Sequence, residues 1–196
     1  SALPGSRGEK RMLSLMRRLL GMLCDAAGVL SAVFLVILFG LMIVMSGGRQ
    51  FGLNIPAGDD FAAWAMVAVA FLGLAHTYRR GEMIRVGFVI ERLTGGVRRF
   101  METFCLVVGL VFTGFFARHA FQLSFDSWRF DDMSQGSVAV PLWIPQVAMV
   151  VGLSLLALAM LDDLIRVLSG DRASYEKDPP KTAEELIERV AQGGGV

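Results

Sequence analysis

The sequence is poor in the side chains that carry chemistry. Its 196 residues include two cysteines, Cys24 and Cys105, and two histidines, His76 and His119. The cysteines are far apart and form no Cys-x-x-Cys pair, which is too little for a disulfide framework or a thiolate metal site. The chain also has no HExxH motif and no phosphate loop of Walker type. We therefore expect neither an enzyme nor a bound cofactor or metal.

Charge is scarce as well, at 19% of the residues and a net value of +1, which argues against a nucleic-acid partner. In its place are long apolar runs, and 54% of the residues are hydrophobic. Because about 20 apolar residues cross a bilayer, four runs predict transmembrane helices. They lie at about 26–48, 61–78, 103–125 and 141–161. Such helices have no polar face for water, so the predicted fold class is an all-α integral membrane protein.

The basic residues divide unevenly between the two sides of these spans. Sixteen of the 19 lysines and arginines fall in the N-terminal segment, the segment between spans two and three, and the C-terminal tail. Only Arg49, Arg118 and Arg129 fall on the other side. The positive-inside rule predicts cytoplasmic termini and a multi-pass protein of the bacterial inner membrane. We expect the first run to be a retained span and not a signal peptide.

The remaining segments predict peripheral elements. Residues 1–22 have apolar residues at helical spacing among arginines, which is typical of an amphipathic helix on the inner leaflet. Residues 84–93 are similar and predict a short membrane-parallel helix, with a plain cytoplasmic loop as the alternative. Residues 23–168 then form a four-helix membrane domain. Residues 169–196 form a cytoplasmic polar tail with a short capped helix.

The predicted topology leaves little room for chemistry inside the membrane. His76 falls at the inner end of span two and His119 at the outer end of span three, roughly 20 Å or more apart across a ~30 Å core. They cannot ligate one haem iron. Glycines on the spans suit close helix contacts; they are Gly28, Gly40, Gly73, Gly109, Gly114 and Gly152. The residues favour a subunit that supports another protein. A membrane anchor of an oxidoreductase complex and a stand-alone four-helix carrier are the alternatives.

Several local patterns occur together in one order. Arg49 follows span one, then come Asn54 with Pro56 and the acidic pair Asp59–Asp60. A Phe-Leu-Gly stretch at 71–73 precedes a basic residue, Gly and Ile-Arg-Val at 80–86, and Pro-Leu-Trp-x-Pro at 141–145 precedes span four. In these motifs and in topology the chain, over about residues 20–168, resembles the small, four-helix membrane subunit of tripartite ATP-independent periplasmic (TRAP) transporters.

The resemblance implies an importer of three parts. A periplasmic substrate-binding protein captures an organic acid, commonly a carboxylate, and a large multi-span membrane subunit moves it by an elevator-type motion driven by sodium. The small subunit is a scaffold on the large one and holds neither substrate nor sodium. Candidate partner-interface residues are Arg49, Asn54, Asp59, Asp60, Gly81, Ile84, Arg85, Val86, Arg118 and Trp143. Candidate contacts to lipid head groups are Arg79, Arg80, Arg98 and Arg99.

Overall fold

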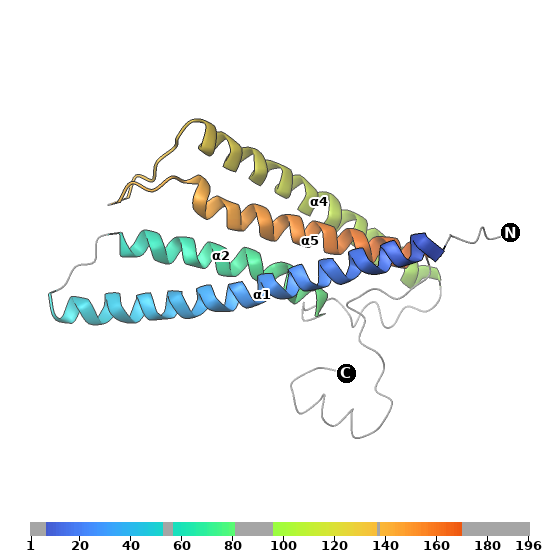
Figure 1. Ribbon diagram of the computed structural model, residues 1–196, viewed down its shortest axis with the longest axis horizontal. Coiled ribbons are helices and arrows are strands. Elements are labelled where there is room, and N and C mark those ends of the chain that lie inside the picture. Colours follow the sequence, from blue (N-terminus) through green and yellow to red (C-terminus); the bar gives the residue numbers. More distant parts are fainter. Residues whose placement is uncertain (1–6, 53–56, 81–95, 137, 170–196) are drawn as a thin grey trace, which may run out of the picture.

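Four long helices make up the computed structural model, which describes residues 7–52, 57–80, 96–136 and 138–169 (Figure 1). They are α1 (Arg7–Gln50), α2 (Gly58–Arg79), α4 (Gly96–Arg129) and α5 (Trp143–Ser169). All four are long and apolar enough to cross a membrane, by length and composition. Within these ranges the β-pairing is a single isolated bridge, between Met133 and Pro141. The predicted all-α membrane fold with four spans is confirmed.

The helices are arranged as a row and not as a closed bundle. Helix α2 packs against α1 on one side and α5 on the other, and α4 packs against α5 alone among the described helices. The order across the row is therefore α1, α2, α5, α4 (Figure 1). Helix α1 crosses α2 obliquely, so that its N-terminal part also reaches α5. Two helices are inside the row and two are at its edges.

Helix α1 is longer than any single span requires. At 44 residues it measures about 66 Å, twice the ~30 Å of the hydrocarbon core. The structure joins the basic, amphipathic N-terminal segment to the first span as one continuous helix, in place of a separate element on the leaflet. Its leucines, methionines and arginines are good helix formers and no proline interrupts them. The predicted helices at 84–93 and in the tail lie outside the described residues.

Small residues let the inner helices approach closely. The buried positions of α2 include Ala65, Ala68 and Ala75, spaced so that they lie on one face. Opposite them, Gly152 of α5 is buried against the backbone of Phe71, and a Cβ atom at this position would collide with the Phe71 carbonyl group. Contacts of this kind suit membrane helices, whose association depends on packing.

The helix starts follow local chemistry at the end of the row opposite the N-terminus. Asp59 and Asp60 occupy the first turn of α2, where carboxylates complement the helix dipole. The fourth helix was expected to begin at Pro141, but it begins at Trp143. The reason is a loop pairing, because the Leu142 amide donates to the Asp132 carbonyl oxygen at 2.9 Å and keeps residues 141–142 out of the helix.

Candidate functional site: an ion-pair cluster and two exposed helix faces

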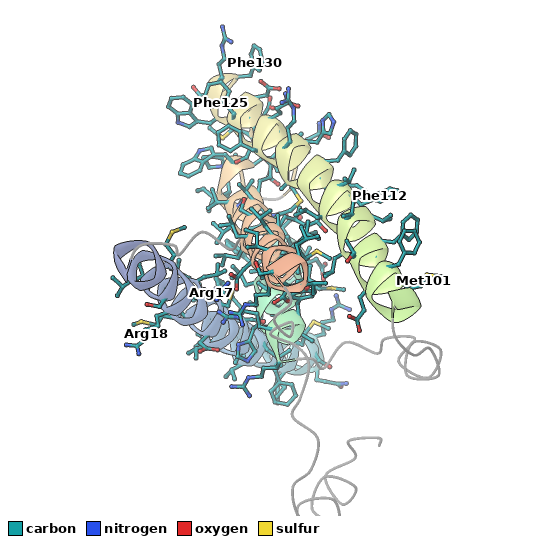
Figure 2. The ribbon with its side chains drawn as sticks, turned by 90° about the vertical axis from the view of Figure 1, so that its right-hand side faces the viewer. Arg17, Arg18, Met101, Phe112, Phe125 and Phe130 are labelled. Carbon is teal, nitrogen blue, oxygen red and sulfur yellow. The ribbon has the colours of Figure 1, made fainter. Side chains whose placement is uncertain are left out.

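Polar side chains gather at the N-terminal end of the row, where α1 and α4 begin and α2 and α5 end. Asp162 of α5 is at the centre of a three-residue cluster. Its Oδ1 accepts from Arg17 Nε of α1 at 3.0 Å, and its Oδ2 accepts from Arg166 Nε at 2.9 Å. All three side chains are largely buried, and Asp162 is only 16% exposed. The cluster therefore fixes the crossing of α1 over α5, and Figure 2 shows Arg18 pointing away from it.

A second contact joins α1 to α2 about two turns further along α1. His76 Nδ1 lies 3.3 Å from Asp25 Oδ1. The imidazole ring lies directly over Gly28, where a Cβ atom would collide with it. Gly28 therefore provides the space that the ring occupies. This His76 is an interhelical packing residue with a carboxylate beside it.

Arg79, a predicted lipid contact, is half-buried, and its guanidinium group lies beside Gly21 of α1. A Cβ atom at Gly21 would lie 3.0 Å from Arg79 Nη1, which is buried without a hydrogen-bond partner. The guanidinium group is also close enough to the buried Cys24 thiol to interact with it. Arg80, the next residue, is exposed at the end of α2.

The other predicted site residues lie mainly at the opposite end. Arg49 is exposed in the last turn of α1 and Asp59 is exposed in the first turn of α2. The Asp60 carboxylate lies against Gly136 in the loop between α4 and α5, so the start of α2 contacts a loop that is far away in sequence. Trp143 is half-buried at the start of α5.

Several predicted positions are not among the described side chains. Arg98 and Arg99 lie in the first turn of α4, and only their backbone is described. The rest lie outside the described ranges: Asn54, Gly81, Ile84, Arg85 and Val86.

The two edge helices have wide exposed faces. On α1 these include Val29, Val36 and Phe39, each at least 66% exposed. On α4 the exposed residues are strongly aromatic, and Figure 2 shows Phe112 on the side of α4 away from α5. The exposed aromatic residues of α4 are Phe100, Phe104, Phe112, Phe115, Phe116, Phe121, Phe125 and Trp128. Apolar faces of this extent need lipid or a partner protein to cover them.

Arg118 and His119 lie on the exposed side of α4. The His119 ring contacts the Phe115 ring, with centroids 4.3 Å apart. His76 is on α2, which does not touch α4. The two histidines are thus on helices that do not contact each other, and in the described ranges no three His, Cys, Asp or Glu side chains are placed to hold a metal.

Together these features define a multi-pass α-helical membrane protein with wide apolar faces on its two edge helices. Comparison with known families adds a specific assignment, because residues 38–170 match the model of the tripartite ATP-independent periplasmic transporters, DctQ component. This match spans more than half of the chain, from the last third of α1 to the end of α5. The chain belongs to this family and is a small membrane component of TRAP transporters. No curated protein and no solved structure gives a significant match.

The ion-pair cluster was not predicted from the sequence. Asp162 and Asp163 directly follow the predicted fourth span, and Arg17 lies in the amphipathic N-terminal segment. The available signal was an acidic pair in the last turns of one span, together with an arginine before another span. The spacing of Asp162 and Arg166, four residues apart on one helix, indicates that pair from the sequence. The pairing with Arg17 follows only once the helix order is known.

Proposed function

We propose that this chain is the scaffold subunit of a sodium-driven, binding-protein-dependent importer of organic acids, most of them carboxylates. In this proposal it packs on the large multi-span membrane subunit, which carries substrate and sodium. A periplasmic substrate-binding protein is the third component. The observation that supports it is the family match, which covers most of the helical region.

The surface of the chain agrees with a role through contact. The only charged residue between Phe104 and Phe125 of α4 is Arg118, and α1 has none between Ala26 and Gly48. Carriers that bind ions themselves place charges or broken helices near the midplane. The described spans instead offer apolar faces on both edges of the row. A scaffold for a moving transport domain needs this type of surface.

We further propose that the N-terminal end of the row is cytoplasmic and that the membrane is the bacterial inner membrane. The support is the charge distribution, with 16 of 19 basic residues on that side. In this orientation Asp162 and its two arginines brace the scaffold at the cytoplasmic boundary. Arg49, Asp59 and Asp60 then face the periplasm, where the substrate-binding protein docks.

The test is co-expression with the large membrane subunit encoded beside this chain, with an affinity tag on the large subunit alone. We expect the two to co-purify in mild detergent at a constant ratio, and an unrelated four-span membrane protein to be lost. Reconstituted with the binding protein, the pair should take up a carboxylate only with an inward sodium gradient. Failure to co-purify contradicts the scaffold role.

Two further measurements separate the alternatives. A visible absorption spectrum of the purified chain with a haem signal would favour the oxidoreductase anchor. Sodium-driven uptake by liposomes that contain this chain alone would favour the stand-alone carrier. We expect neither signal.

A further inference from the structure

The exposed face of α4 differs from an ordinary lipid-facing surface in one respect. Three polar side chains interrupt it, since Arg118, His119 and Gln122 are all exposed. They are flanked by Phe115 on one side and Phe125 on the other, which are 58% and 47% exposed. Positions 115, 118, 119 and 122 share one face of a helix, because residues three and four apart are neighbours. This face is opposite Leu106 and Ala120, which are buried on the α5 side.

Arg118 is deep in the span. It lies seven residues, about 10 Å along the helix axis, before residue 125, the predicted outer end of the span. Side chains on a helix lean toward its N-terminus. In the proposed orientation the N-terminus of α4 is cytoplasmic, so the Arg118 side chain leans toward the membrane centre and away from the periplasmic surface. Snorkelling to the nearer surface is therefore unfavourable.

No acidic group of the described part of the chain forms an ion pair with Arg118. The nearest carboxylate along the helix is Asp126, eight residues further on and two turns away. An ionised side chain inside a membrane needs a partner. The partner of Arg118 must then come from outside the described residues.

The other edge of the row provides the contrast. Helix α1 is exposed over an equally long face, and the run 26–48 contains no ionisable residue. Because it has no charge, this face suits direct contact with the hydrocarbon chains of lipids. Its exposed Phe39, at 67%, has no charged neighbour on the helix. The two edges therefore suit different neighbours. The face of α1 suits lipid, and the face of α4 suits a protein surface that is apolar but carries polar groups.

We infer that α4 is the docking edge, where the large membrane subunit covers Phe115 and Phe125 and places a carboxylate of one of its membrane helices against Arg118. This inference rests on the proposed function, because it names the face and the chemistry of the contact with that subunit. The carboxylate pairs with the guanidinium, and His119 and Gln122 provide further hydrogen-bonding groups beside the pair. The aromatic residues pack on either side and exclude water.

Photo-crosslinking in the co-expressed complex of the two membrane subunits tests the face. The photoreactive analogue p-benzoyl-phenylalanine replaces Phe115 on α4 or, as the matched control, Phe39 on α1. We expect an adduct with the large subunit from the Phe115 position and none from the Phe39 position. An adduct from the Phe39 position alone, an adduct between two copies of this chain, or no adduct from Phe115 in an intact complex overturns the inference.

Substitution tests the charge. Arg118→Leu should lower the recovered complex about tenfold, the lower end of the effect of losing a hydrogen bond between charged groups, while Arg118→Lys retains most of it. Arg129→Leu, at the exposed end of the same helix, is the control and should change nothing. Each variant chain, purified without the large subunit, should elute at the same volume as the unaltered chain, which verifies that it folds. Full recovery with Arg118→Leu overturns the pairing, whereas failure of the unaltered pair to co-purify contradicts the proposed function instead.

Discussion

Helices α2 and α5 lie inside the row, and helices α1 and α4 form its edges. In the most apolar 18-residue stretch of each inner helix, 28% of the residues are buried. In the corresponding stretch none are buried in α1 and 6% are buried in α4. The inner pair approaches closely where Gly152 meets the backbone of Phe71, whereas the edges present Val, Leu and Phe side chains outward. Burial alone therefore separates the part of the chain that holds the fold from the part that is available to lipid or to other proteins.

The largest effect should come from the closest inner contact. Gly152→Leu forces a side chain into the Phe71 backbone, and overpacking of this kind costs about 3 kcal/mol. The free energy of unfolding in SDS, followed by tryptophan fluorescence, measures the loss. Gly114→Leu on the edge helix α4 is the matched control, because a Cβ atom there meets nothing within 4 Å. Equal losses at both positions would remove the distinction between interior and edge.

A smaller effect should follow at the junction between the α1 edge and the interior. Asp162→Ala leaves Arg17 and Arg166 without their shared acceptor, and hydrogen bonds to charged groups contribute about 1.5–3 kcal/mol. Partial exposure of the arginines places the expected loss of stability near the lower value, about 1.5 kcal/mol.

The same unfolding measurement checks this prediction. Asp126→Ala, on the exposed side of α4, is the control and should change stability by less than about 0.5 kcal/mol. Hydrogen exchange should also rise in the first turns of α1 when Asp162 is removed, because Arg17 ties that part of the helix to α5. An α1 segment that stays protected would show that the cluster does not hold the crossing.

The contrast between interior and edge was only half visible in the sequence. The four spans could be predicted because a charge-free run of 20 residues has few alternatives. Gly40 and Gly152 look alike in sequence, since each is a glycine within an apolar run. Only the neighbouring backbone distinguishes them, and Gly40 has open space while Gly152 has Phe71. Hydropathy records how apolar a helix is and contains no information on which helices touch.

The bounds of the helices show the same limit. The third span was predicted at 103–125, but α4 extends over Gly96–Arg129, because a helix continues through polar residues beyond the hydrocarbon core. The pairing of Asp162 with Arg17 follows from the oblique path of α1, which depends on the continuity of that helix from Arg7. The expected interface residues near Arg85 lie outside the described ranges and stay predictions.

The smallest effect should distinguish the two edges from each other. Ser31 Oγ of α1 donates to the Val69 carbonyl oxygen of α2 at 2.9 Å, whereas Thr113 Oγ1 of α4 reaches only the Met160 sulfur of α5, at 3.6 Å. Thioether sulfur is a weak acceptor, so the two contacts differ in strength. Ser31→Ala should lower the free energy of unfolding by about 0.6 kcal/mol, the average for hydrogen bonds between membrane helices. Thr113→Val should leave it unchanged. If the free energy of unfolding falls as much with Thr113→Val as with Ser31→Ala, α4 is bound to the interior as firmly as α1. An edge helix bound that firmly has less freedom to adjust to a docked partner.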